Sequence, residues 1–287
     1  MITAMSRQDL RAHLTATAIA GPVATPRENS LRKYPGIGAR DPEHLFGLRP
    51  SATWDFDDVL KLMARRCGVS PDPQYTSGPD HIDPDLVLDG LDAMSQRLAA
   101  AAQAKATVVI ATGHPAGLLA VHAELSRALT AAGCRLLTPG LLWNGDIGFG
   151  QREWAEVRYL DNVATLSSRG SLLHSHSPAP MEAMLQEMSL AGELPDLVIA
   201  DHGLAGAAAQ AGIRTVCFAD CNDPGLFVGA EEGVVDVCVP IDDNVLPHLY
   251  APVSAYLLHR SGLMRADHRP SAPPGVTVLQ QRAGGAG

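Results

Sequence analysis

The chain has 287 residues, of which 46% are hydrophobic, and its mean hydropathy is +0.03. This much apolar material is enough for a large folded core and excludes disorder over most of the chain. The formal net charge is −9, and no run of Lys and Arg occurs. A groove for nucleic acid needs clustered basic side chains, so nucleic acid is excluded as a partner.

The cysteines indicate neither a disulfide scaffold nor a zinc knuckle, because their number is odd and no CxxC spacing occurs. They are Cys67, Cys134, Cys217, Cys221 and Cys238. Charged residues interrupt positions 1–20, so no secretory signal is expected there, and no segment is long and apolar enough to span a membrane. We therefore expect a cytoplasmic protein with no membrane partner.

The N-terminal third is predicted to be mainly helical. A loose capping box begins at Ser6, and helical spacing of apolar residues recurs over 54–66. An Asp-Pro pair, typical of an N-cap and a first helical turn, begins a long helix over 83–104. The stretch 23–50 is rich in Pro, Gly, Arg and Asn and has no period, which predicts a functional or disordered loop.

From Thr107 onward, short apolar runs alternate with helical spacing. A buried strand over 107–111, a tight turn, a helix over 116–132 and a strand over 134–137 form a predicted βαβ unit. Further strands are expected at 197–200, 215–218 and 234–240, with helices after the first and the last of them, and a helix is expected near Pro180. This alternation predicts an α/β fold with a parallel, Rossmann-like sheet flanked by helices.

We expect three regions along the chain. Residues 1–104 form a mainly helical N-terminal region that packs on the core, and residues 105–264 form the α/β catalytic domain. Residues 265–287 are rich in Pro, Ala and Gly and are expected to be a disordered tail.

Polar residues follow several of the predicted strands, and the carboxyl ends of parallel strands meet at one edge of the sheet. The strand ends carry Thr112-Gly113-His114, Asp201-His202, Asp220-Cys221-Asn222-Asp223 and Asp242-Asp243-Asn244. Carboxylates gathered at one edge repel one another unless a cation lies between them. Oxygen and imidazole ligands at this edge therefore indicate a divalent metal ion such as Mg or Mn.

Each of these residue groups has a structural alternative. Asp and Asn are favoured turn and cap residues, so Asp201 is alternatively a helix cap, and Asp220 and Asp223 alternatively shape a turn. Asp242-Asp243-Asn244 is interpreted as the cap of a final helix running to about 259.

Other residues are candidates for binding a phosphate group. The backbone of Gly113 and the side chain of His114 stand at the start of a helix, where free N–H groups attract anions. Arg27, with Asn29 beside it, is a candidate bidentate phosphate clamp, although a surface arginine is the alternative. Asn144 is a further candidate, the alternative being a tight Asn-Gly turn.

Two histidines and one more carboxylate complete the candidate set. His174 and His176 are two residues apart on an expected extended segment, so their side chains point the same way, as in many metal or phosphate sites. An exposed polar loop is the alternative. Asp146 is a candidate metal ligand in the same turn as Asn144.

The chain resembles a group of actinobacterial proteins described as phosphatases. The resemblance covers nearly the whole chain except the tail, and it rests on Ile19-Ala20-Gly21, Ala24-Thr25-Pro26-Arg27-Glu28-Asn29, Ala111-Thr112-Gly113-His114-Pro115-Ala116-Gly117, Ala200-Asp201-His202-Gly203 and Phe218-Ala219-Asp220-Cys221-Asn222-Asp223-Pro224. It implies an activity on phosphate esters without fixing a substrate.

A more distant resemblance is to the metal-dependent damage-control phosphatases, which also join a helical N-terminal part to an α/β domain. The Asp-Asn pair that holds the metal in that family is Thr112-Gly113-His114 here. Its phosphate-binding Lys is replaced by Asp201-His202. This resemblance therefore implies the architecture, while the metal site differs.

These observations together lead to the hypothesis of metal-assisted hydrolysis of a small phosphorylated metabolite. Asp201, Asp220, Asp223 and Asp146 are the candidate metal ligands. The candidate catalytic residues are His202, His174 and His176, and the candidate phosphate-binding residues are Gly113, His114, Arg27, Asn29 and Asn144.

Two alternatives remain open. One is a nucleotide-sugar or sugar-phosphate transferase or isomerase that uses the same strand-end site. The other is a non-catalytic protein that binds a phosphorylated metabolite. A homodimer is also left open.

Overall fold

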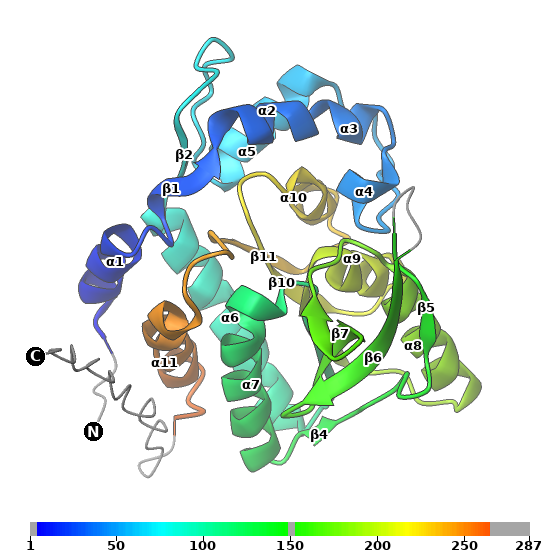
Figure 1. Cartoon of the computed structure of the whole chain (residues 1–287). Coiled ribbons are helices and arrows are strands. Elements are labelled where there is room, and N and C mark those ends of the chain that lie inside the picture. The colour runs from blue at the N-terminus through cyan, green and yellow to red at the C-terminus, as the bar shows by residue number, and fades with distance from the viewer. Residues whose placement is uncertain (1–4, 149–152, 265–287) are drawn as a thin grey trace, which may run out of the picture.

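The computed structural model describes residues 5–148 and 153–264, and Figure 1 shows their arrangement. These residues form a small antiparallel sheet of β1 (Gly21–Pro26) and β2 (Pro79–Ile82), and a large sheet of nine strands. The tail predicted over 265–287 lies outside the described residues.

The long helices predicted in the N-terminal third are confirmed. They are α1 (Arg7–Ala16), α5 (Phe56–Arg66) and α6 (Pro84–Ala104). Each begins after a capping side chain that accepts a hydrogen bond from a backbone N–H of the first turn, namely Ser6, Asp55 and Asp83. The caps at Ser6 and Asp83 were predicted from the sequence, whereas Asp55 was not.

The expectation of an irregular loop over 23–50 is wrong. β1 continues directly into α2 (Arg27–Lys33), which is followed by α3 (Pro35–Gly38) and α4 (Pro42–Leu45). These helices have seven, four and four residues, which is too short for a helical period to show in the sequence. Figure 1 shows α2, α3 and α4 beside α10 (Pro224–Glu231).

The large sheet is mixed, so the expectation of a purely parallel sheet is wrong. Its strand order is β11-β10-β9-β3-β7-β6-β5, with β4 beside β3 and β8 beside β7. The parallel pairs join β3 (Thr107–Ala111), β4 (Arg135–Leu136), β7 (Val163–Ser168), β9 (Leu197–Asp201), β10 (Thr215–Ala219) and β11 (Val237–Pro240).

The antiparallel part comes from hairpins between residues 144 and 173. β5 (Asn144–Asp146), β6 (Trp154–Leu160) and β8 (Ser171–Leu173) each pair antiparallel with a neighbour. The two tight turns around β7 consist of residues with positive φ, Asp161-Asn162 and Arg169-Gly170. Such turns suit two-residue hairpins, because their twist matches that of the strands.

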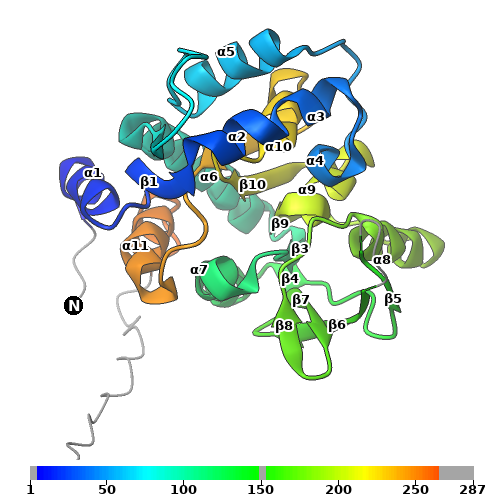
Figure 2. The same cartoon turned by 45° about the horizontal axis from the view of Figure 1, so that its top comes forward.

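Helices cover both faces of the large sheet. α11 (Ala251–Arg260) packs against α6 and α7 (Pro115–Ala131), and α9 (His202–Gln210) packs against α8 (Ala179–Leu190) and α10. Figures 1 and 2 show these two groups on opposite sides of the parallel strands. The βαβ units predicted around β3 and β9 are therefore confirmed. None of the described helices combines the length and apolarity needed to cross a bilayer.

A continuous hydrophobic core extends from Leu10 to Leu258 in the sequence. It includes side chains from the predicted helical region and from the predicted α/β region. The division at residues 104 and 105 stays a prediction.

The final helix begins later than the sequence predicted. α11 starts at Ala251, after a 3₁₀ turn η1 (Pro247–Tyr250), so Asp242 does not cap it. Instead, the Asp242 carboxylate accepts hydrogen bonds from the backbone N–H groups of Ala24 (3.3 Å) and Asn244 (2.9 Å). Asp242 thereby fixes the loop after β11, which carries Asp243.

Candidate active site

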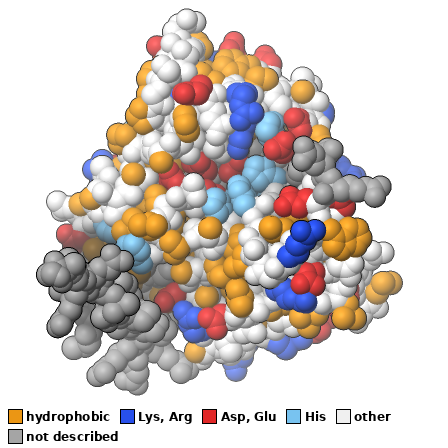
Figure 3. Space-filling model, in the orientation of Figure 1, with side chains coloured by type: hydrophobic (Ala, Val, Ile, Leu, Met, Phe, Trp, Pro, Cys, Tyr) orange, Lys and Arg blue, Asp and Glu red, His pale blue; other side chains and the backbone are white. Residues whose placement is uncertain are grey.

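A cavity of about 960 Å³ lies at the carboxyl ends of the parallel strands β3, β9, β10 and β11. The structure brings the loops after all four strands to this cavity. Its titratable lining includes His114, His174, His176, His202, Asp220, Asp223, Asp242 and Asp243. Figure 3 shows histidine side chains gathered in a hollow, with acidic side chains beside them.

His202 is held in place by the carboxylate of its neighbour Asp201. The Nδ1 of His202 donates to the Oδ1 of Asp201 at 2.8 Å, and the backbone N–H groups of Gly113 (2.7 Å) and His114 (3.1 Å) donate to the same oxygen. With Nδ1 engaged, the other ring nitrogen, Nε2, faces the cavity. A carboxylate behind a histidine in this way fixes the tautomer and ring orientation of a metal ligand.

The backbone of His202 is in the left-handed region, with φ of 50° at the start of α9. This conformation costs a non-glycine residue about 1–2 kcal/mol. Such strain persists where the surroundings impose it and is concentrated at functional sites. Here it turns the imidazole into the cavity directly after a buried strand.

The segment that carries His174 and His176 packs against two glycines. The backbone N–H of Ser175 donates to the carbonyl of Gly113 at 2.9 Å. A Cβ at Gly113 would lie 2.5 Å from the Ser175 carbonyl oxygen, and a Cβ at Gly203 would lie 2.1 Å from the His176 carbonyl oxygen. Only glycine permits this approach, which brings both histidines to the ends of β3 and β9.

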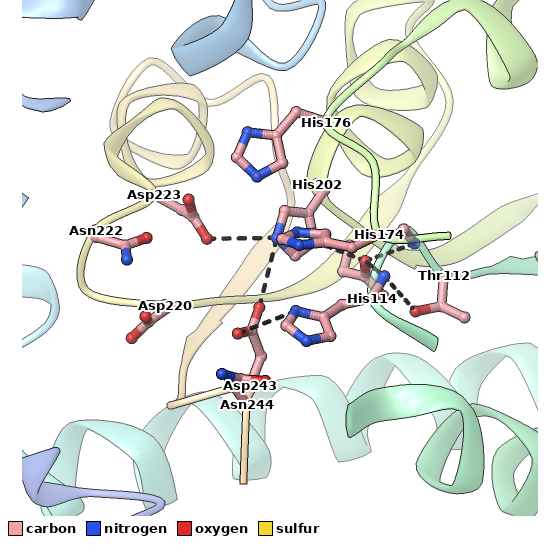
Figure 4. Close-up of polar contacts among 12 residues, drawn as sticks. Thr112, His114, His174, His176, His202, Asp220, Asn222, Asp223, Asp243 and Asn244 are labelled. Carbon is pink, nitrogen blue, oxygen red and sulfur yellow. Dashed lines mark hydrogen bonds and ion pairs between the residues drawn. The ribbon is translucent and has the colours of Figure 1, made fainter. Parts of the chain in front are cut away.

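Three side chains meet around the Nε2 of His202, as Figure 4 shows. The Nε2 of His174 lies 3.3 Å from it. The Oδ2 of Asp243 lies at 3.5 Å and the Oδ2 of Asp223 at 3.6 Å. On the other side of Asp243, its Oδ1 lies 3.3 Å from the Nδ1 of His114.

The electrostatics of the cluster favour positive charge at this point. Burial alone would lower the pKa of His202, but the hydrogen bond to Asp201 and the charges of Asp223 and Asp243 outweigh it and raise the pKa to about 9. Burial, together with the nearby His202, lowers the pKa of His174 to about 4 and that of His176 to about 3. The cavity therefore stabilises one proton or one cation at the Nε2 of His202, beside neutral imidazoles.

The wall opposite His202 is acidic. Burial raises the pKa of Asp220 well above its usual value, and the neighbouring Asp243 and Asp242 raise it further. Burial, together with Asp243, also raises the pKa of Asp242. Negative charges on neighbouring carboxylates repel one another, and a cation placed between them stabilises their ionised forms.

α2 contributes the basic group of the site. Lys33 lines the cavity, and its Nζ donates to the Oδ1 of Asn222 (2.9 Å) and contacts the Oδ1 of Asp223 (3.3 Å). Asn29, one turn earlier on the same helix face, also lines the cavity. Among the described lining residues, Lys33 is the one lysine or arginine.

The residues around His202 fit a divalent metal ion. Two groups of three have ligand atoms within 4.8 Å of one another: His114, His174 and His202, and His176, His202 and Asp223. Two nitrogens bound to one tetrahedral ion are about 3.4 Å apart, which is close to the separation of the His174 and His202 Nε2 atoms. The buried atoms His114 Nδ1 and Asp243 Oδ2 have no hydrogen-bond partner. Imidazoles favour a transition-metal ion over Mg.

Five residues singled out in the sequence do not line the cavity. Gly113 gives its N–H to Asp201, so that N–H is not free for an anion, and Asp201 itself is fully buried behind His202. Asn144 and Asp146 lie on the exposed edge strand β5. The Oδ1 of Asp146 accepts hydrogen bonds from backbone N–H groups of its own hairpin.

Arg27 is the fifth of these residues. Its guanidinium is fully buried beside Asp80 (3.4 Å) and donates to the carbonyls of Ser70 (2.7 Å) and Tyr75 (3.1 Å). These bonds tie α2 to the loop before β2. The guanidinium therefore stabilises the N-terminal region and does not line the cavity.

Sequence reasoning missed Asp243 and Lys33. Asp243 follows the buried strand β11, just as Asp201 and Asp220 follow or end β9 and β10, so the strand-end pattern had already marked it. Asp243 was left out of the candidate site because Asp242-Asp243-Asn244 was interpreted as a helix cap. Lys33 follows Asn29 by four residues, which signals a shared face only once α2 is recognised as a helix.

Fold and site together define an α/β protein with a cavity at the carboxyl ends of its parallel strands, where ligands bind in such sheets, and with His and Asp side chains that could hold a metal ion. The chain belongs to the family described as Phosphatase, which matches residues 5–265. It is similar to phosphatase SCO2771 of Streptomyces coelicolor, with 45% identity over 261 residues that cover 90% of this chain and 97% of that protein. The expected resemblance to actinobacterial phosphatases is confirmed.

Proposed function

We propose that this cavity hydrolyses phosphate monoesters of small metabolites with a divalent transition-metal ion bound at His202. The observation that carries the proposal is the convergence of His174, Asp223 and Asp243 on the Nε2 of His202 within 3.3–3.6 Å. The family and the name of the Streptomyces relative support action on phosphate esters.

The metal ligands in this proposal are His202, His174 and Asp223, with Asp243 beside them. A bound divalent ion supplies a Lewis acid for the phosphoryl oxygen and lowers the pKa of a bound water. Asp201 holds the Nδ1–H of His202, so that the lone pair of Nε2 faces the cavity. The Nδ1 of His176 donates to the Glu43 carbonyl at 3.3 Å. The Nε2 of His176 is therefore available as a ligand atom, like that of His202.

The substrate is anchored from α2 and from the loop between β10 and α10. Lys33 supplies positive charge to a phosphate oxygen, and the amides of Asn29 and Asn222 donate hydrogen bonds to it. A cavity of about 960 Å³ has room for a metabolite larger than phosphate itself. We also propose that the parallel strands and their helices form a Rossmann-like unit, since the site lies beyond their carboxyl ends.

The test is phosphate release from a panel of phosphorylated sugars, amino acids, nucleotides and aryl phosphates. The protein is stripped of metal and reloaded with Zn²⁺, Mn²⁺ or Co²⁺. We expect release from at least one compound, lost with chelator and in His202→Ala, and retained in His259→Ala, a matched change on the exposed end of α11.

Several results would contradict the proposal. Undiminished release in chelator, or in His202→Ala, would exclude the metal at His202. Thermal stabilisation by a phosphorylated ligand with no turnover would instead indicate a binding protein. Dependence on a second substrate would indicate a transferase.

A further inference from the structure

The cavity holds more metal-ligating side chains than one ion uses. A catalytic ion usually takes three protein ligands and keeps a position open. Six side chains converge here: His114, His174, His176, His202, Asp223 and Asp243. Five of them, all except Asp243, form two groups of three that share only His202.

His202 cannot serve both groups. Its Nδ1 is bonded to Asp201, so it offers a single ligand atom, Nε2. One nitrogen lone pair binds one ion. If both groups are to hold a cation, another side chain has to join the two positions.

Asp243 has the placement of such a bridge. Its Oδ1 lies 3.3 Å from the Nδ1 of His114, and its Oδ2 lies 3.5 Å from the Nε2 of His202, so its two oxygens face different imidazoles. Figure 4 shows the carboxylate between the two rings. Its side chain is 6% exposed and that of His114 is 8% exposed.

Two buried polar atoms at this bridge lack the hydrogen-bond partners that buried polar atoms normally have. The Oδ2 of Asp243 and the Nδ1 of His114 are buried, and neither has a hydrogen-bond partner. A buried polar atom without a partner loses its hydration and gains no hydrogen bond in return, which destabilises the folded protein. Both atoms become satisfied if an ion lies on each side of the carboxylate.

We propose that the cavity binds two divalent ions bridged by Asp243, the first at His176, His202 and Asp223 and the second at His114 and His174. This inference rests on the metal site of the proposed function. It adds a second ion and assigns His174 to that ion, with His176 taking the place of His174 beside His202 and Asp223. Pairs of ions about 3.5–4 Å apart are suited to clamping the attacking and leaving oxygens of a phosphoryl group.

The experiment is a count of bound ions that does not depend on activity. Metal-free protein is loaded with Zn²⁺, freed of excess by gel filtration, and its zinc is measured by mass spectrometry. We expect about two ions per chain, falling to about one in His114→Ala and in His176→Ala. The matched control His259→Ala keeps two. Asp243→Asn preserves the side-chain volume and is expected to hold one ion at most, because an amide bridges poorly.

Manganese provides a second readout. With Mn²⁺, the wild-type protein is expected to give the electron paramagnetic resonance spectrum of a spin-coupled pair, and His114→Ala that of an isolated ion. Circular dichroism of each variant verifies that it is folded.

The outcomes separate the two proposals. One ion per chain in the wild type, unchanged in His114→Ala, would overturn the bridged pair and leave a single metal at His202. No bound ion at all would overturn both proposals. Two ions in the wild type that both persist in Asp243→Asn would refute the bridge.

Discussion

Asp201→Asn is the most informative single change outside the metal ligands themselves. Asp201 does not line the cavity, yet its Oδ1 accepts hydrogen bonds from His202 and from the backbone of Gly113 and His114. Asparagine has the same shape and keeps an acceptor oxygen there. The substitution therefore removes the charge behind His202 while preserving the backbone contacts.

The expected loss follows from the kind of hydrogen bond involved. A hydrogen bond to a charged group contributes about 1.5–3 kcal/mol and a neutral one about 0.5–1.5 kcal/mol, so the difference is about 1–1.5 kcal/mol. This corresponds to roughly tenfold in an equilibrium constant. Removing the carboxylate partner of a metal-bound histidine typically weakens metal binding by about 10–100-fold. We expect Asp201→Asn to weaken binding by about tenfold or more.

The assay is competition between the protein and a chelator of known affinity for Zn²⁺. Asp196→Asn is the matched control. Asp196 precedes the same strand, β9, and its Oδ2 accepts hydrogen bonds from the backbone N–H and hydroxyl of Thr107, but it lies at the opposite end from the cavity. Zinc affinity equal in Asp201→Asn, Asp196→Asn and the wild type would refute the role of Asp201.

Three further predictions concern other parts of the chain. Gly203→Ala introduces a Cβ 2.1 Å from the His176 carbonyl oxygen, and we expect a loss of about 1–3 kcal/mol in unfolding free energy together with weaker zinc binding; unchanged values of both would contradict the close packing. Lys33→Met should raise KM for phosphate esters about tenfold, with a smaller change in kcat. Lys61→Met, on the exposed face of α5, should leave KM unchanged. Steady-state kinetics measures both variants, and equal KM values in the two would show that Lys33 does not bind the substrate. The pKa of Glu232 is lowered, because hydrogen bonds from Trp54, Ser51 and Ala52 outweigh burial, which alone would raise it. The contribution of Glu232 to the free energy of unfolding is therefore present above the pKa of the unfolded state and is lost as pH falls through the lower pKa of the folded state. Glu232→Gln should lower the free energy of unfolding in urea by about 1 kcal/mol at pH 7 and leave it unchanged at low pH. A difference that does not depend on pH would contradict this prediction.

The parallel half of the fold was predictable from the sequence because short buried apolar runs alternate regularly with segments of helical spacing. β3, α7 and β4 follow one another as a buried apolar run, helical spacing and a second run, and β9, α9 and β10 repeat the pattern. The hairpins between 144 and 173 were not predicted. Their alternation is weak, as in β6, where the exposed side includes Trp154 and Leu160, and their turns lack the usual Asn-Gly pair.

The candidate site was predictable to the extent that it depends on strand ends. His114, His202, Asp220 and Asp223 were identified from that rule, and the structure brings them to one cavity. The roles within the site depend on side-chain geometry. Whether a carboxylate faces the cavity, as Asp223 does, or stands behind a histidine is decided by packing against a strand distant in the sequence.

The central claim is that a divalent ion binds at the Nε2 of His202. Crystals grown with Zn²⁺ and examined by anomalous diffraction at the zinc edge test it most directly. The account predicts an anomalous peak about 2.0–2.1 Å from that nitrogen, with His174 or His176 and an aspartate as further ligands. Zinc peaks only elsewhere on the protein, with His202 still bonded to neighbouring side chains, would contradict it.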